Sequence, residues 1–247
     1  MDNFEIKDGV AIIPKGTREI PNNAFFGCSS LTTIIIPESV TNIGSGAFSD
    51  CSSLTSVVIP ESIKRIGSFA FYGCSSLTSV VIPKSVKIIG NNAFDGCSSL
   101  TSIVISEGVE SIKGRAFFGC TSLTSIFIPK SVTSIGEAVF GACTSLTSII
   151  VEDGNPIYDS RDNCNAIIET ATNKLICGCK STVIPASVKS RGYFPKGLFR
   201  RNSKGRFLKT DKEKAKRNYH YYTVKSYEEA KNLHTIYGLI MTLFVIL

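Results

Sequence analysis

The stretch Cys51–Gly73, CSSLTSVVIPESIKRIGSFAFYG, recurs along the chain with few changes and decides the fold. Its cysteine has a counterpart every 23 residues, and the six equivalent positions are Cys28, Cys51, Cys74, Cys97, Cys120 and Cys143. A fixed period in the twenties is typical of a solenoid, in which each repeat forms one coil and buries its apolar side only against its neighbours. The period therefore predicts a single elongated repeat domain.

Each repeat opens with a short segment that predicts a strand. Leu54, Val57 and Ile59 are expected to point inward, while the residues between them point out, with the period of two that strands require. Pro60 ends the segment because proline cannot donate to a continuing ladder. Gly67 is expected to supply a permissive backbone where the coil turns its corner. The sequence thus predicts one parallel strand in every coil.

The far side of the predicted core is assigned to Phe71 and its counterparts, stacked from coil to coil. The six periodic cysteines are expected beside these rings as buried, reduced thiols, since free Cys behaves as a small hydrophobe. Cys164, Cys177 and Cys179 fall outside the period, and without a nearby histidine we assign them to core or hairpin positions. We expect no metal and no cofactor, and the odd total of 9 cysteines does not support a closed disulfide framework.

The repeat template LTSIxIPxSVTSIGxxAFxGC resembles the BspA-like bacterial leucine-rich repeats over roughly residues 4–192. The resemblance implies a leucine-rich repeat solenoid, a β-rich right-handed coil. Members are typically large secreted or surface proteins used in adhesion and partner binding, and their repeat motif holds no catalytic residues. The resemblance thus implies a protein partner, such as a host or bacterial surface protein, and a secreted or cell-surface location. The first residues of this chain show no signal-peptide pattern, which leaves the cellular location open.

Three segments depart from the template. An insertion around 152–180 contains two apolar runs on either side of Thr170–Asn173, which predicts a β-hairpin. Asp159 and Asp162 lie in a polar stretch of this insertion, and we interpret them as part of a solvated loop because the spacing of an EF-hand is absent. The family pattern then ends near residue 192.

The remaining two segments form a tail with its own charge and hydropathy. Residues 1–188 hold 13 basic and 16 acidic side chains, whereas residues 189–219 hold 12 basic and 2 acidic ones, so 193–225 is predicted to be a basic linker. We do not expect nucleic-acid binding, because no recognised motif accompanies the basic residues. The segment 226–247 is predicted to be an apolar helix, opened by a capping box at Ser226–Glu229. Its apolar run is too short for the ~30 Å core of a bilayer, so we do not expect membrane contact.

The repeats contain few residues of the types that enzymes use for catalysis. Both histidines, His220 and His234, lie in the tail, so no imidazole is available for a Ser-His or Cys-His pair in the solenoid. No phosphate loop, dinucleotide fingerprint or zinc motif is present. We therefore predict no enzyme activity and no small-molecule substrate.

The outward positions of the predicted strands form the candidate binding site on the concave face. One file is apolar and consists of Ile35, Val58, Val81, Val104, Phe127 and Ile150. Beside it runs a file of hydroxyl side chains, consisting of Thr33, Ser56, Ser79, Ser102, Ser125 and Ser148. A continuous exposed apolar stripe often marks an interaction site. The alternative is a structural repeat fragment of a larger surface protein, because β-branched residues suit strands and duplication copies them without selection for binding.

Overall fold

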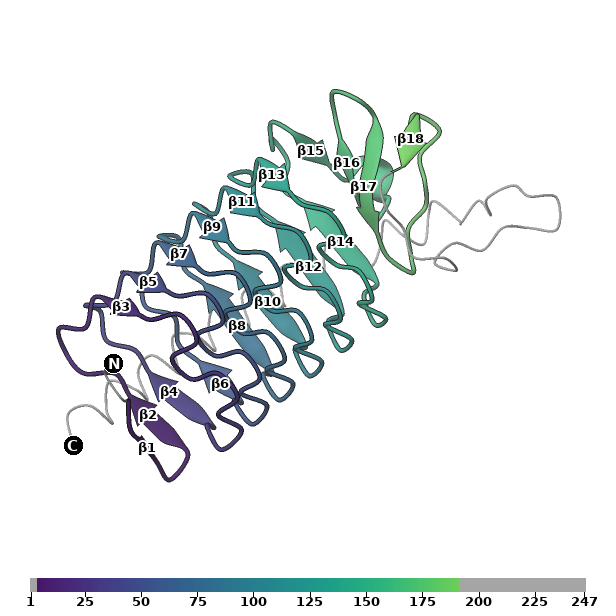
Figure 1. Ribbon diagram of the computed structural model, residues 1–247. Coiled ribbons are helices and arrows are strands. Elements are labelled where there is room, and N and C mark those ends of the chain that lie inside the picture. Colours follow the sequence, from purple (N-terminus) through teal and green to yellow (C-terminus); the bar gives the residue numbers. More distant parts are fainter. Residues whose placement is uncertain (1–3, 192–247) are drawn as a thin grey trace.

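The computed structural model describes residues 4–191, which stack as successive coils along one axis into an elongated β-solenoid (Figure 1). The chain advances coil by coil from β1 and β2 at one end to β15–β18 at the other (Figure 1). The predicted basic linker, 193–225, and the predicted helix, 226–247, lie outside the described residues.

The predicted strands form the main sheet of the solenoid. They are β2 (Val10–Ile12), β4 (Thr33–Ile35), β6 (Ser56–Val57), β8 (Ser79–Ile82), β10 (Ser102–Ile105), β12 (Ser125–Ile128) and β14 (Ser148–Val151). Neighbours other than β10 and β12 pair in parallel with a shift of one repeat, and in this row of strands only β1 (Ile6–Lys7) pairs antiparallel, with β2. The ladder runs unbroken from β1 to β10, whereas β12 and β14 form a separate two-stranded sheet. The interruption follows the fourth repeat, in which Ser106 replaces the usual proline.

A second parallel sheet runs along another edge of the coils, so the prediction of one strand per coil was wrong. Its strands are β3 (Glu19–Ile20), β5 (Asn42–Ile43), β7 (Arg65–Ile66), β9 (Ile88–Ile89), β11 (Ser111–Ile112) and β13 (Ser134–Ile135). Each has only two residues, and in most of them a single side chain, such as that of Ile43 or Ile66, is buried. Two residues are too few to show an alternating pattern, so these strands could not be recognised by periodicity.

The predicted stack of phenylalanines is confirmed. The rings of Phe48, Phe71 and Phe94 follow one another with centroids 5.1 Å apart and planes tilted by 15° and 7°. The stack continues through Phe25 and Phe4 in one direction and through Phe117 and Phe140 in the other, with centroid separations of 5.2–5.6 Å. The stack therefore forms a continuous apolar spine along the coils.

Five of the periodic cysteines are buried free thiols, as predicted, and each also makes a hydrogen bond to the neighbouring coil. The Sγ of Cys51 donates to the carbonyl of Phe25 at 3.1 Å, and the Sγ of Cys74 donates to that of Phe48 at 3.1 Å. The same bond recurs at Cys97, Cys120 and Cys143. Each thiol thus joins its coil to the phenylalanine spine of the coil before it.

Burial changes the chemistry of these thiols. It raises the pKa of Cys51 from 9.0 to about 12, and the nearby Cys28 adds a smaller repulsion. Cys28 is itself only half-buried, contrary to the prediction for all six positions, because it belongs to the first coil of the series. Among the described residues only an incomplete coil precedes it, and this coil leaves the thiol partly uncovered.

Gly67 stands at a corner where the backbones of adjacent coils touch. A Cβ on Gly67 would lie 2.6 Å from the carbonyl carbon of Gly44, and one on Gly90 would lie 2.6 Å from that of Gly67. These glycines do not have a positive φ. Glycine is thus required at the corner, but not for the predicted reason. The adjacent backbone leaves no room for a Cβ, whereas φ at Gly67 is not positive.

The insertion after β14 forms a four-stranded sheet at the end of the solenoid. The strands β16 (Ala166–Glu169) and β17 (Lys174–Gly178) form an antiparallel hairpin, flanked by β15 (Tyr158–Asp159) and β18 (Ser190–Arg191). Cys164, Ala166, Ile168 and Leu175 form a small core of their own. The hairpin therefore packs as an ordered cap.

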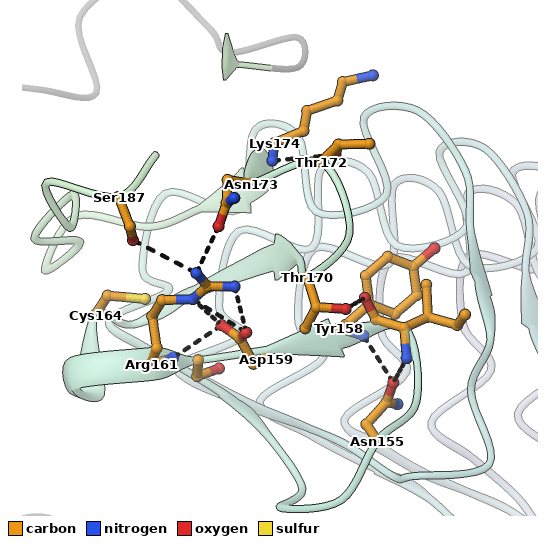
Figure 2. Close-up of polar contacts among 12 residues, drawn as sticks. Asn155, Tyr158, Asp159, Arg161, Cys164, Thr170, Thr172, Asn173, Lys174 and Ser187 are labelled. Carbon is orange, nitrogen blue, oxygen red and sulfur yellow. Dashed lines mark hydrogen bonds and ion pairs between the residues drawn. The ribbon is translucent and has the colours of Figure 1, made fainter. Parts of the chain in front are cut away.

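Polar contacts hold this cap together (Figure 2). The guanidinium of Arg161, in the short 3-10 segment η1 (Arg161–Asn163), binds both carboxylate oxygens of Asp159 and donates to Asn173 at 2.6 Å. Asn155 accepts from the backbone N–H of Tyr158 and donates to the carbonyl of Val132 in the preceding coil. Asp159 is thus part of a partly buried ion pair, and its assignment to a solvated loop was wrong.

Candidate interaction surface

The apolar file and the hydroxyl file lie side by side on the main sheet. Both files are on the face that points away from the core, which is called the outer face below and is the face that the sequence analysis named concave. Parallel pairing places Ser79 opposite Ser56 and Ser102, and it places Val81 opposite Val104. Further along, Phe127 pairs with Ile150. The register thus stacks members of the same file, one coil apart, because adjacent strands are shifted by one repeat.

The apolar file is less exposed than the alternation of the strands suggested. Ile35, Val58, Val81 and Phe127 are half-buried, whereas Val104 and Ile150 are 8% and 7% exposed. The last two are therefore corrected from exposed to buried positions, and they are the members that flank Phe127, the largest side chain of the file. Strands only ~4.8 Å apart allow neighbouring side chains to cover one another, which a period of two cannot reveal.

The file of hydroxyl side chains is more accessible. Ser79 is exposed, and Thr33, Ser56, Ser102, Ser125 and Ser148 are half-buried. A separate row of threonines runs just before it and links the coils. The hydroxyl of Thr55 donates to the carbonyl of Thr32, and that of Thr78 donates to the carbonyl of Thr55. The threonine hydroxyls therefore hold adjacent coils together. The hydroxyl file, one residue further along each coil, is the row that is available to a partner.

A cleft of about 600 Å³ opens on a different surface, formed by the tight turns at 22–27, 45–50, 68–73 and 91–96 together with Arg115. Three aromatic side chains line it, those of Phe26, Phe69 and Tyr72, together with amide, carboxylate and guanidinium groups. The sequence reading missed this cleft because its residues occupy the variable positions of the template. The available signal was Phe69 itself, the only aromatic residue at a position where the other repeats carry Asn, Gly, Arg or Ala.

The structure also bears on metal binding and on the cysteines outside the period. Within 4–191, no group of three or more His, Cys, Asp or Glu side chains could hold a metal ion. Cys164 and Cys179 are buried and Cys177 is half-buried, in or next to the hairpin of the cap. In the same part of the chain, no helix has the length and apolar content needed to cross a membrane.

A solenoid with a parallel strand in each repeat, an inward leucine at the start of every coil and a phenylalanine spine defines a leucine-rich repeat protein. The model of the BspA-type leucine-rich repeat region matches residues 9–94 and 64–193, with six copies. The chain therefore belongs to the BspA-type leucine-rich repeat family.

Solved structures agree with this assignment. A leucine-rich cell surface protein from Faecalibacterium prausnitzii is 31% identical, with a TM-score of 0.52 over 68% of this chain and 53% of that protein. The pneumococcal vaccine antigen PcpA is 20% identical, with a TM-score of 0.64 over 78% of this chain and 60% of that protein, and its likeness shows the fold alone. The chain thus spans little more than half the length of these two proteins. No curated protein matches the chain.

Proposed function

We propose that the chain is a non-enzymatic protein-binding module of a cell surface, and that it binds its partner through the outer face of its main sheet. The observation that carries this proposal is the in-register apolar file beside a file of hydroxyl side chains. Desolvated apolar area supplies binding energy, and neighbouring hydroxyls supply adaptable hydrogen bonds. The similarity to a bacterial cell surface protein supports the location.

Partner preference follows from the geometry of this face. The apolar file runs along several coils, which suits an extended protein surface better than a small molecule enclosed in a pocket. Phe127 is the largest member and the preferred anchor, and Ile35, Val58 and Val81 extend the contact. Val104 and Ile150 contribute less because they are already covered.

A charge introduced into the file tests the proposal. Val58→Asp and Val81→Asp place a carboxylate on the outer face, and both should weaken partner binding at least tenfold while leaving the thermal melt nearly unchanged. Val80→Asp is the matched control, since Val80 lies one residue away and is 3% exposed in the core. It should unfold neighbouring coils because an unpaired buried charge is strongly unfavourable.

The measurement is capture of partners from bacterial and host surface extracts, with melting curves for every variant. Equal capture by the outward variants and the unmodified protein, with normal melting, would remove this face as the binding site.

A second candidate function is a structural spacer within a larger surface protein, without a partner of its own. The near-identity of the repeats favours it, because duplication of one template would produce the apolar file with no selection for binding. The capture experiment separates the two functions, since a spacer retains no partner from any extract.

A further inference from the structure

The cleft on the tight turns is shaped by where large and small residues fall in successive coils. Phe26, Ser49 and Tyr72 occupy the same position in three consecutive repeats, directly after the core phenylalanine. Ser49, at 5% exposed, is much smaller than Phe26 and Tyr72, and all three residues line the cleft. Phe26 and Tyr72 are two coils apart, about 10 Å at the usual strand spacing. One flat ring in van der Waals contact with both would need a spacing of about 8 Å, so a gap of about 10 Å admits a single ring that rests on one of the two aromatic side chains.

Phe69 is held in this cleft by an unfavourable backbone conformation. Its φ is 59°, and the equivalent residues Asn23, Gly46 and Asn92 share positive values of 57°, 63° and 54°. Stacking imposes this geometry, because the N–H of Phe69 donates to the carbonyl of Asn91 in the next coil at 2.8 Å. Gly and Asn accept such dihedrals readily, whereas an aromatic residue does not.

The aromatic side chain at this position is also exposed. Phe69 is 45% exposed and contacts Tyr72 edge to face, with centroids 5.9 Å apart. The positive φ and the solvent-exposed ring of Phe69 each lower the stability of the folded chain. Such strain is concentrated at functional sites. Arg115 stands at the equivalent position two coils later, also with a positive φ, 56°, and it lines the same cleft.

The polar side chains that line the cleft are held by hydrogen bonds and an ion pair, and their charges nearly cancel. The guanidinium of Arg115 lies 4.0 Å over the ring of Phe118, and its Nε is 3.6 Å from a carboxylate oxygen of Asp95. Asp95 also accepts a hydrogen bond from Asn92 at 2.7 Å. Asp50 is exposed and accepts from the hydroxyl of Ser49 at 3.3 Å, and a carboxylate has room for further donors. The charged residues lining the cleft are two carboxylates and one guanidinium.

This combination matches the chemistry of a neutral sugar. The C–H face of a pyranose packs against aromatic rings, and its hydroxyls donate to carboxylates and accept from amide and guanidinium N–H groups. A strongly cationic ligand is disfavoured because Asp95 is already engaged by Arg115 and Asn92. We propose that the cleft between Phe26, Phe69 and Tyr72 is a saccharide-binding site for a neutral sugar, separate from the outer face of the main sheet.

The repeats themselves supply a variant that removes the ring without harming the fold. Phe69→Asn installs the residue found at the equivalent positions 23 and 92, so its melting temperature should equal or exceed that of the unmodified chain. Arg115→Asn makes the same change at the other end of the cleft. Ile12→Thr is the control, because Ile12 is 62% exposed on β2 and does not line the cleft.

The probes are neutral tetrasaccharides of glucose, galactose, mannose and N-acetylglucosamine, with a proline-rich decapeptide as the comparison ligand. Saturation-transfer NMR and titration of the full chain should show binding of at least one tetrasaccharide. Phe69→Asn should weaken that binding at least tenfold, Arg115→Asn should weaken it severalfold, and Ile12→Thr should leave it unchanged.

Three results would overturn the proposal: no transfer to any tetrasaccharide, undiminished sugar binding by Phe69→Asn, or binding of the decapeptide alone. A melting temperature of Phe69→Asn below that of the unmodified chain would overturn the strain argument on which the proposal depends.

Discussion

Replacing Gly67 with alanine tests how the corners of the coils are packed. The new Cβ would lie 2.6 Å from the carbonyl carbon of Gly44, and a relaxed carbon–carbon contact needs about 3.5 Å, so the two backbones must separate by about 0.9 Å. The hydrogen bond from the N–H of Gly67 to the carbonyl of Ile43 is 2.9 Å long and would stretch beyond a useful length.

The energies can be compared term by term. Overpacking of this kind costs about 1–3 kcal/mol, and the weakened hydrogen bond costs about 0.5–1.5 kcal/mol. Loss of the glycine's freedom in the unfolded chain opposes this by only about 0.4–1 kcal/mol. We therefore expect Gly67→Ala to lower the free energy of unfolding by about 0.5–4 kcal/mol.

Gly114→Ala provides a matched control. A Cβ on Gly114 would lie 3.5 Å from its nearest neighbours, an ordinary contact, and the residue does not have a positive φ. Only the unfolded-state term remains, so this variant should be neutral or more stable by up to about 1 kcal/mol. Urea unfolding followed by far-UV circular dichroism measures both. A Gly67→Ala midpoint at or above that of the unmodified protein would refute the close-packed corner.

Two further predictions concern the core. Phe71→Ala, in the middle of the spine, should lower the free energy of unfolding by about 3–5 kcal/mol, whereas Phe4→Ala at its end should cost less than half as much, because Phe4 is only partly buried; equal urea midpoints for the two variants would contradict a continuous spine. The raised pKa of Cys51, about 12 against 9.0, means that the folded state holds the thiol proton more tightly than the unfolded state. This stability is complete below pH 9 and should be lost as the pH rises from 9 towards 12. Melting temperatures measured across that range should fall more steeply for the unmodified protein than for Cys51→Ala, and parallel curves would contradict the shift.

The sequence was sufficient to predict the features that recur in every repeat. A strict period places equivalent residues one above another, so the strands from Thr33–Ile35 onward and the spine through Phe71 follow directly from the template. The two-residue strands such as Asn42–Ile43 left too short a pattern to recognise. The bond from Cys51 to the carbonyl of Phe25 depends on how adjacent coils are offset, which a single repeat does not contain.

The surface was harder to foresee for a related reason. Val104 and Ile150 occupy outward template positions, and their burial depends on side chains one coil away. The cleft arises only where Phe26, Ser49 and Tyr72 succeed one another. Such features come from differences between repeats, and a template records what the repeats share.

The contacts between coils also explain how such a molecule can change length over generations. The threonine bonds join residues 23 apart and the cysteine bonds join residues 26 apart, so loss or gain of one whole repeat leaves each donor opposite an equivalent acceptor. A single inserted residue within a coil would instead displace every partner beyond it. Unequal crossing-over between similar repeats in the gene can therefore lengthen or shorten the rod without harming its fold. The same event would erase the cleft if it removed the coil that carries Phe69, whereas loss of a coil that does not line the cleft would shorten the rod and leave the cleft intact.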